Sequence, residues 1–383
     1  MDQTLREGMQ HRGIVFSGEE KKKILRFQQC LGVDICQAGY PPAHASEKQS
    51  VAHLQEIAIK EKFNTQVAGM GRANPRDVPV LIETGMNHFH LHTHIQPRDH
   101  RAKQELALNR ITDTVDALRT QRPGAVISMA MLDIGNTPRA FLEQYGDFLI
   151  NILGIDIVSV PDTSGQMAPN TFHDAVKLMV AKATGSGTII SVHCHNDLGM
   201  ATANTVMGVV AGATVVEVSA LGIGERNGIG DLFSVGKILK AQNHEMNLKI
   251  EKTDLFRQYY THVNDICKRQ TGETLLSYNT PFFGNAVNTH VAGTHADTAF
   301  GMGHTEKYYL NVLCGQGLVK KYLTAEQIPF VPETLPQITR TIKDESARLG
   351  RRLFDGEIRD IAHSHPTPDD TGNSDFNSKS MRD

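Results

Sequence analysis

Short apolar runs rich in β-branched residues alternate with longer amphipathic stretches between residues 30 and 220. Successive runs begin about 20–40 residues apart, which is the size of one strand–helix unit. Strands that alternate with helices indicate βαβ units and a parallel sheet. The seven strands that this pattern predicts are Val33–Ala38, Thr65–Gly69, Met86–His92, Ala125–Met131, Ile155–Val160, Thr188–Cys194 and Thr214–Ser219.

The stretches between these runs have the periodicity of helices that bury one face. An eighth strand would have to be Met1–Leu5. Because almost no residues precede the motif of this strand, either the chain begins upstream or the strand is very short. The five clearest helices are Ser46–Glu61, Ala102–Arg119, Thr137–Asn151, Pro169–Ala183 and Ala201–Ala211.

Eight parallel strands with intervening helices predict a TIM (β/α)8 barrel, which typically needs about 250 residues. A doubly wound sheet is the alternative, but it needs fewer strands, and no G-x-G-x-x-G follows the first strand. We therefore expect an α/β fold in which the barrel is followed by a small, mostly helical C-terminal subdomain.

The pattern changes to helices and loops after about residue 250. Lys252–Arg269 and Ala325–Arg352 have helical periodicity, and Thr271–Phe300 is rich in loop residues. From about Ala362 the chain is rich in Ser, Asp, Asn and Pro and has no apolar periodicity, which predicts disorder. The expected organisation is a barrel domain over residues 1–250, flanking subdomains over 251–361 and a disordered tail over 362–383.

Composition excludes several classes of function. Of the 383 residues 40% are apolar and 21% charged, and the net charge of −3 gives no electrostatic footprint for nucleic acid or an anionic membrane. No apolar run is long enough to span a membrane, and the N-terminus lacks the apolar segment of a signal peptide. Five cysteines without C-x-x-C spacing suggest neither a disulfide framework nor a zinc knuckle. We expect a cytoplasmic protein.

Two histidines at the end of a predicted strand are the first candidate for chemistry. His193 and His195 alternate on the strand and so lie on the same side, about 7 Å apart along the backbone. Two imidazoles in this arrangement can hold one divalent ion if a carboxylate supplies a third ligand. Glu7, at the top of the first strand, could be that carboxylate, and Arg6 could hold an oxyanion beside the ion. The alternative is a pair of half-buried histidines that bond only to backbone.

Three further patterns are less specific. Gly222–Gly230 could bind a phosphate or a CoA-type pyrophosphate, or be a tight strand-to-helix connection. In His88-x-His90-x-His92-x-His94 all four imidazoles share one strand face, and we expect only the last one or two to reach a substrate. His290–Asp297, with Tyr308 and Tyr309 after it, could supply an acid or base, or be a surface segment.

Five motifs in order carry a resemblance to a known superfamily. The sequence resembles the DRE-TIM metallolyase superfamily over about residues 2–315, and it is most similar to homocitrate, 2-isopropylmalate and citramalate synthases. The last motif favours these synthases over HMG-CoA lyases and hydroxy-oxovalerate aldolases, which share the barrel. The motifs are Asp2–Gln10 (D-T-T-L-R-D/E-G-x-Q), Ser159–Gly165 (D-T-x-G), His193–Gly199 (H-x-H-N-D-x-G), Gly222–Ile229 (G-x-G-E-R) and His290–Asp297 (H-x-x-G-x-H-A-D).

The resemblance implies a divalent metal, Mg²⁺, Mn²⁺ or Zn²⁺, held by Glu7, His193 and His195. It implies that Arg6 stabilises the carbonyl oxygen or enolate and that Thr163 holds the carboxylate of a 2-oxo acid. His295 and Tyr309 would act from the flanking subdomain, often that of a partner subunit, so a homodimer is expected. Gln10, Gly224 and Glu225 would complete the substrate site, and acetyl-CoA would be the co-substrate.

The sequence departs from the superfamily pattern at several positions. Gln37 stands where the family has a strand-two Glu, and Ile229 stands where isopropylmalate synthases have an Asn ligand. If the N-terminal segment counts as the first strand, the fifth is Ala125–Met131, and the segment from Ile127 to Asp133 lacks the S-x-E-D-x-x-R pattern of the family. The general base is therefore unassigned, and 2-oxoglutarate is disfavoured as a substrate. Met129 and Met131 stand where polar groups are expected. Asp133 could replace the missing acid only if the strand register shifts. The chain lacks a regulatory domain of the leucine-pathway type, so feedback inhibition by that route is not expected.

The expected reaction is a metal-dependent Claisen-type condensation of an acyl-CoA, acetyl-CoA above all, with a small 2-oxo acid. Its products would be CoA and a 2-hydroxy-2-alkyl diacid, in amino-acid biosynthesis or specialised metabolism. Two alternatives remain open. One is a C–C bond lyase or aldolase on the same metal site, and the other is a catalytically impaired homologue that only binds a ligand.

Overall fold

All seven strands predicted from the apolar runs are present, and they pair in parallel in the order β1 to β7. The computed structural model describes residues 1–131, 133–287, 289–291 and 307–365. Each strand lies within a few residues of its predicted bounds. They are β1 (Ile35–Gly39), β2 (Gln66–Arg72), β3 (His88–His92), β4 (Val126–Ala130), β5 (Ile157–Asp162), β6 (Ile189–Cys194) and β7 (Val215–Glu217).

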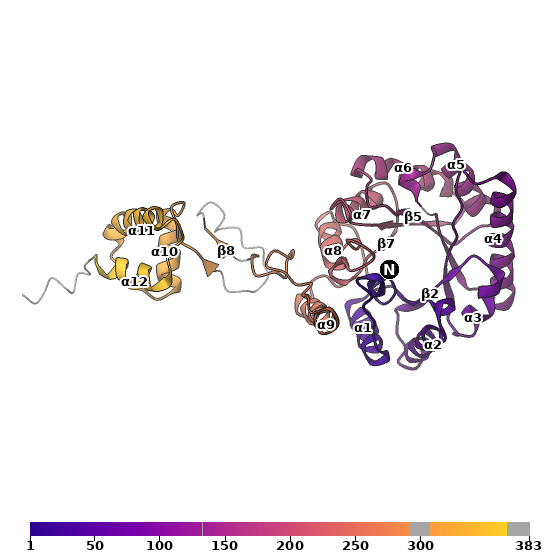
Figure 1. Cartoon of the computed structure of the whole chain (residues 1–383), viewed down its shortest axis with the longest axis horizontal. Helices are drawn as coiled ribbons and strands as arrows, with labels where there is room; N and C mark the ends of the chain where they lie inside the picture. The colour runs from indigo at the N-terminus through magenta and orange to yellow at the C-terminus, as the bar shows by residue number, and fades with distance from the viewer. Residues whose placement is uncertain (132, 288, 292–306, 366–383) are drawn as a thin grey trace, which may run out of the picture. The chain divides into compact units, whose positions relative to one another are not determined.

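The N-terminal segment closes the sheet into a barrel. Asp2 forms parallel bridges to Cys36 in β1 and to Val218 directly after β7. The Asp2 N–H donates to Ile35 O over 2.8 Å, and the Gln3 N–H donates to Val218 O over 2.8 Å. The predicted TIM barrel is confirmed, with its first strand reduced to this bridge. Figure 1 looks along the barrel and shows helices around the ring of strands.

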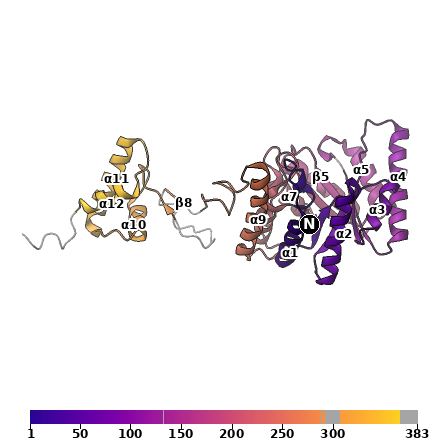
Figure 2. The same cartoon turned by 60° about the horizontal axis from the view of Figure 1, so that its bottom comes forward.

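The helices of the barrel cover its outer face (Figures 1 and 2). Local signals set their ends: α1 starts with a capping box between Ser17 and Glu20 and ends at Gly32 in the left-handed conformation. The helix expected over 137–151 ends at Asp147 and continues as a π-helical turn. The helices are α1 (Gly18–Leu31), α2 (Ala45–Lys60), α3 (Val78–Ile82), α4 (Arg101–Gln121), α5 (Arg139–Asp147), α6 (Pro169–Ala183), α7 (Ala201–Val210), α8 (Leu232–Ala241) and α9 (Thr253–Thr271).

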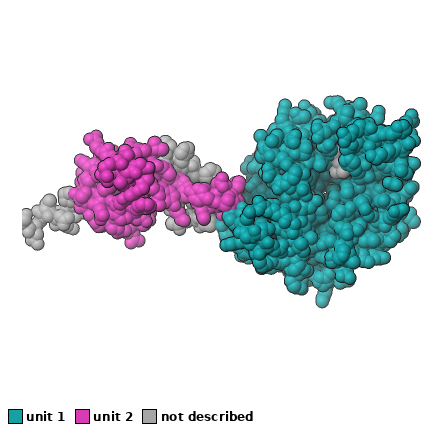
Figure 3. Space-filling view, in the orientation of Figure 1, with its two compact units in different colours: residues 1–276 teal, residues 277–383 magenta. Residues whose placement is uncertain are grey.

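The chain divides into two units after Leu276, rather than after residue 250 (Figure 3). Helix α9 belongs to the first unit because its aromatic side chains pack on the barrel. The Tyr259 ring stacks on Phe27 of α1, with 5.4 Å between the ring centroids. The Tyr259 hydroxyl donates to Asp2 Oδ2 over 2.9 Å, so α9 also anchors the segment that closes the barrel.

The second unit is mostly helical, as expected, and has an apolar core of its own. Ala362, where the disordered tail was expected to begin, is buried in the last helix, and residues 366–383 lie outside the described residues. None of the helices described in either unit is long and apolar enough to cross a bilayer. The elements of this unit are β8 (Thr289–His290), β9 (Lys307–Tyr308), α10 (Gln316–Ala325), α11 (Leu335–Leu349) and α12 (Asp355–His363).

The interior of the barrel has an apolar layer and a polar layer. An apolar cluster that includes Met1, Ile35, Ala68 and Ile157 fills the end where the strands start. The residues further along the strands are polar, although barrel interiors are usually filled by branched aliphatic side chains. Each is at most 2% exposed, and they are Gln3, Gln37, His90, Ser128, Ser159, Ser191 and Glu217. His88, at the start of β3, is a buried polar residue at the other end of the barrel.

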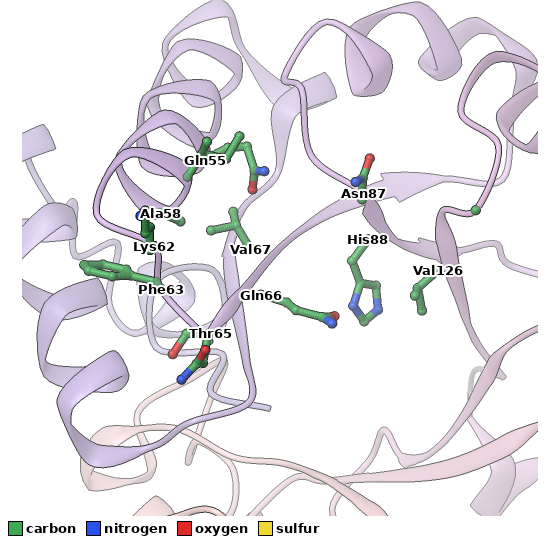
Figure 4. A pocket seen from close by; sticks show the side chains of 13 residues that line it. Gln55, Ala58, Lys62, Phe63, Thr65, Gln66, Val67, Asn87, His88 and Val126 are labelled. Atoms are coloured by element: carbon green, nitrogen blue, oxygen red, sulfur yellow. The ribbon is translucent and has the colours of Figure 1, made fainter.

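A cavity of about 410 Å³ opens at the amino-terminal end of the barrel. Figure 4 shows that its walls come from the end of α2 and the starts of β2, β3 and β4, with His88 on one side. His88 Nε2 lies 2.6 Å from the Ser128 hydroxyl oxygen. Among the residues that the structure describes, none of the predicted site residues lines this cavity, so the predicted chemistry lies elsewhere.

Replacing His88 by Gln should make the stability of the protein less sensitive to acid. Burial lowers the pKa of His88 from 6.5 to about 3, so the unfolded chain takes up this proton at a higher pH than the folded chain. Its contribution to the free energy of unfolding is complete above pH 6.5 and falls by about 1.4 kcal/mol per pH unit below it.

Urea denaturation at pH 7 and pH 5 should therefore show a loss of free energy that is about 2 kcal/mol smaller in His88→Gln than in the wild type. His53→Gln, which removes an exposed histidine of α2, is the control. Equal losses in all three proteins would show that His88 does not contribute to acid sensitivity.

Candidate metal and substrate site

Glu7, His193 and His195 meet at the end of the barrel where the strands finish. His193 lies in β6 and His195 directly after it, and Glu7 begins a short 3₁₀ helix that follows the closing segment. One ligand atom of each residue lies within 4.8 Å of the other two, and all three side chains are buried. His193 Nε2 and His195 Nε2 are 3.2 Å apart.

This donor set fits a divalent ion. Metal–ligand bonds of about 2.1 Å place neighbouring ligand atoms about 3 Å apart, which is close to the spacing of the two imidazole nitrogens. Burial lowers the pKa of His195 to about 4, so its imidazole is in the neutral, ligating form at neutral pH. The structure thus brings together the three ligands predicted from the sequence, and metal binding by them stays a prediction.

Glu7 is held as a carboxylate by groups on three sides. Burial raises its pKa, but the charge of Arg6, the neighbouring imidazole of His193 and the backbone N–H of Glu225 outweigh this and lower the pKa to about 2. The Glu225 N–H donates to Glu7 Oε1 over 3.0 Å. A Cβ at position 224 would lie 2.9 Å from Glu7 Cγ, so Gly224 lets the loop approach the carboxylate. Contact of Gly224 with a substrate stays a prediction.

The Arg6 guanidinium is fixed by four neighbours. It forms an ion pair with Glu7, and its Nε donates to Gln37 Oε1 over 2.5 Å. Its two Nη atoms each donate to an amide oxygen 3.2 Å away, one in Gln10 and one in Gln3. Gln37 therefore serves as a neutral acceptor where the superfamily has a Glu, which leaves Glu7 as the charge partner of Arg6.

Thr163 is oriented by the loop after β4. The Asp133 N–H donates to Thr163 Oγ1 over 2.9 Å, so the hydroxyl proton of Thr163 is free to point elsewhere. Asp133 adopts a φ of +56°, which is unusual for a residue other than Gly and brings its N–H to this position. Arg226 Nη2 donates to Thr163 O over 2.7 Å and is itself paired with Asp197.

A pocket of about 240 Å³ adjoins the three candidate ligands. Of the eight predicted site residues that are described and are not glycine, all but Tyr309 line this pocket; their ligand and substrate roles stay predictions. They are Arg6, Glu7, Gln10, Thr163, His193, His195 and Glu225. The remaining lining residues are Met70, His90, Ala130, Ser159, Pro161, Glu217 and Arg226.

Two polar lining residues escaped the sequence analysis. His90 is 2% exposed and reaches the pocket from the middle of β3, whereas we expected only the last histidines of the run to do so. His92 instead lies 3.1 Å from the Tyr40 hydroxyl oxygen. Glu217 is the last residue of β7, a three-residue strand whose apolar neighbours hid it. Its position at a strand end, after an apolar run, is the signal that could have found it.

The structure also shows which side of β4 faces the site. Met129 and Met131 are buried away from the pocket, and Ala130 lines it. The methionines therefore do not occupy the site, and the inward position carries a side chain with no acid or base. Asp133 contacts Thr163 through its backbone and does not replace the missing carboxylate in the pocket.

The residues predicted beyond the barrel belong to the second unit. His295 lies outside the described residues. The Tyr309 N–H donates to His290 O over 2.9 Å, and the Arg352 guanidinium lies over the Tyr309 ring at 4.8 Å. The catalytic roles of His295 and Tyr309 stay predictions.

Comparison with known proteins identifies the family of this chain. A family profile described as HMGL-like matches residues 1–258. The chain belongs to the HMGL-like family. This confirms the resemblance to the DRE-TIM superfamily that the motifs indicated.

Relatives with curated names include synthases. A 2-isopropylmalate synthase of Sulfurisphaera tokodaii is 37% identical over 256 residues, which cover 66% of this chain and 64% of the relative. A provisionally named 2-isopropylmalate synthase of Methanosarcina acetivorans is 29% identical over 94% of this chain and 70% of its own length. A provisionally named (R)-citramalate synthase of Methanopyrus kandleri is 29% identical over 94% of this chain and 71% of its own length.

Solved structures of this HMGL-like fold include lyases. The HMG-CoA lyase of Bacillus subtilis matches 74% of this chain and 96% of its own, with a TM-score of 0.60 and 17% identity. At this level of identity the similarity establishes the fold, and the reaction has to be inferred from the site.

Replacing Gly224 by Ala should weaken metal binding. The added Cβ would lie 3.0 Å from Glu7 Oε1 as well as 2.9 Å from its Cγ, so the carboxylate has to move. Displacing a ligand in this way should raise the Kd for Zn²⁺ about 10-fold in isothermal titration calorimetry. Gly18→Ala, where the new Cβ meets open space, is the control. A Kd that is the same in both variants and the wild type would contradict the packing role of Gly224.

Proposed function

We propose that this HMGL-like protein is a metal-dependent synthase that condenses acetyl-CoA with a small 2-oxo acid. The observation that supports this most directly is the convergence of Glu7, His193 and His195 on one point beside the Arg6 guanidinium. The synthase names of the relatives favour the same chemistry. An ion bound by these three residues would supply a Lewis acid that polarises the ketone of the 2-oxo acid.

In this proposal the chain's own residues orient the acid and stabilise charge. The Thr163 hydroxyl, held by the Asp133 N–H, would donate to the carboxylate of the 2-oxo acid. Arg6 would face the ketone oxygen, because a fixed cation stabilises the negative charge that develops there. Gln37, Gln10 and Gln3 hold the guanidinium in place, so little reorganisation is needed during the reaction.

The condensation forms one carbon–carbon bond and cleaves one thioester. The methyl group of acetyl-CoA loses a proton, and the resulting carbanion adds to the ketone carbon. The ketone oxygen takes up a proton, and water hydrolyses the thioester to release CoA and a 2-hydroxy-2-alkyl diacid. Among the described lining residues, His90, Glu217 and Glu225 carry proton acceptors outside the three candidate ligands. Because both oxygens of Glu217 already accept hydrogen bonds from Gln3 and Ser191, His90 and Glu225 are the candidates for the base.

Free-thiol release from acetyl-CoA with Mg²⁺ or Mn²⁺ tests the proposal. The panel of 2-oxo acids is pyruvate, 2-oxoisovalerate, 2-oxoglutarate, oxaloacetate, phenylpyruvate and phosphonopyruvate. We expect release that depends on one acid and on the metal, and we expect 2-oxoglutarate to be inactive. His193→Ala should lose both metal and turnover. Wild-type protein that binds metal but releases no thiol with any acid would overturn the synthase and direct the search to carbon–carbon cleavage.

Replacing Arg6 by Gln should separate binding from catalysis. The variant keeps Glu7 and both histidines, so the Kd for Mn²⁺ should stay within a few-fold of the wild type. Loss of the cation should lower kcat by about 10²–10³-fold, because charge on the ketone oxygen is then unopposed. The matched control is Arg139→Gln, which removes an exposed arginine paired with Glu143. An unchanged kcat in Arg6→Gln would refute the electrostatic role of Arg6.

A further inference from the structure

Glu217 is a carboxylate at the centre of the barrel, 1% exposed, on the floor of the candidate site. Gln3 Nε2 donates to its Oε2 over 2.7 Å, and the Ser191 hydroxyl donates to its Oε1 over 2.6 Å. His193 Nδ1 lies 3.3 Å from Oε2, within the range of an ion pair. Both oxygens of Glu217 therefore act as hydrogen-bond acceptors, one toward Gln3 and one toward Ser191.

The contact with His193 decides which of its ring nitrogens carries the proton. A neutral imidazole has one N–H, on either Nδ1 or Nε2. A buried carboxylate accepts hydrogen bonds and does not donate them, so Glu217 favours the proton on Nδ1. The lone pair of Nε2 is then free, and Nε2 is the nitrogen that lies 3.2 Å from His195 Nε2, on the side of the candidate metal.

We propose that Glu217 is a positioning residue of the metal site: it fixes the Nδ1-protonated tautomer and the ring orientation of His193. This inference rests on the metal site of the proposed function. Carboxylates that hold the second nitrogen of a ligating histidine raise its basicity and orient its ring. Glu217 thus acts on the ion through His193 and is separate from the three candidate ligands.

The two histidines of the site are unequal in this respect. Within the described part of the chain, both His193 Nδ1 and His195 Nδ1 are buried without a hydrogen bond of full geometry, but a carboxylate oxygen, Glu217 Oε2, lies 3.3 Å from His193 Nδ1. The orientation of His195 therefore rests on packing, whereas that of His193 rests on a charged neighbour. A change at Glu217 should act on one ligand of the pair and leave the other in place.

The same carboxylate is connected to Arg6 by a single amide. Gln3 Nε2 donates to Glu217, and Gln3 Oε1 accepts from Arg6 Nη2 over 3.2 Å. The carboxylate and the guanidinium together determine which way the amide points. The buried network therefore connects β7 to the segment that closes the barrel. Glu217 could have only a structural role in this connection, and an experiment has to separate that role from the positioning of His193.

The test compares Glu217→Gln with the wild type by Zn²⁺ titration calorimetry and by the visible spectrum of bound Co²⁺. Gln has nearly the same volume, and its single amide oxygen can still accept from Ser191. Its NH₂ group then takes the place of Oε2, the oxygen that accepts from Gln3 in the wild type. Its NH₂ group then faces His193 Nδ1 and favours the proton on Nε2, where it blocks the ion. We expect the Kd for Zn²⁺ to rise by about 10–100-fold and the Co²⁺ bands to change.

Two further variants make the result decisive. Glu217→Asp keeps a carboxylate and should recover part of the affinity, and it is also the variant to use if Glu217→Gln does not fold. Ser128→Ala removes a buried hydroxyl of the barrel interior that lies beside His88, and it should leave the Kd unchanged. Thermal melts of the metal-free proteins show which variants are folded.

The outcomes separate this inference from the proposed function. A folded Glu217→Gln protein with the wild-type Kd and Co²⁺ spectrum would overturn the positioning role and leave Glu217 as a structural carboxylate. Equal weakening in Glu217→Gln and Glu217→Asp would contradict the expected recovery by a carboxylate and would also overturn the positioning role. Failure of the wild-type protein to bind Zn²⁺ or Co²⁺ would overturn the metal site itself.

Discussion

Closure of the barrel at Asp2 is the constraint on which the candidate site depends. The backbone of this residue pairs with β1 on one side, and its neighbours pair with the segment after β7 on the other. The Asp2 carboxylate also accepts from the Thr4 hydroxyl over 2.6 Å and from the Tyr259 hydroxyl. Arg6 and Glu7 follow within one turn, so the hydrogen bonds that close the barrel also place the cation and the carboxylate of the site.

This arrangement replaces much of the apolar filling of the barrel by polar groups. Burying a carboxylate such as Glu217 costs free energy unless each of its oxygens has a partner. Here the three partners come from two other segments: Gln3 from the N-terminal segment before β1, and Ser191 and His193 from β6. The network therefore links strands that the sheet alone would join only through backbone. The fold is stabilised instead by the apolar layer at the end where the strands start and by the packing of the helices on the outer face of the barrel.

The sequence predicted the strands well because parallel strands in a barrel are apolar on the face that packs against helices. It also predicted the three candidate ligands, since a H-x-H at a strand end and a carboxylate after the closing segment share one rim of the barrel. The sequence could not predict which side chains of β4 point into the site, because a shift of one residue in strand register would place Met129 there in place of Ala130. Glu217 was missed for a related reason: three valines surround it, and periodicity in so short a strand is weak.

In the proposed function, the charge of the pocket determines the order in which the metal ion and the 2-oxo acid bind. Two arginines and three glutamates line the pocket, so with neutral imidazoles it carries one net negative charge. Such a pocket attracts a divalent cation and repels the carboxylate of a 2-oxo acid. Two added positive charges reverse the sign, and the anionic acid is then attracted. The 2-oxo acid should therefore bind well only after the metal ion has bound. Glu217 favours binding of the ion in two ways: its negative charge attracts the cation, and its contact with His193 leaves the Nε2 lone pair free to bind the ion.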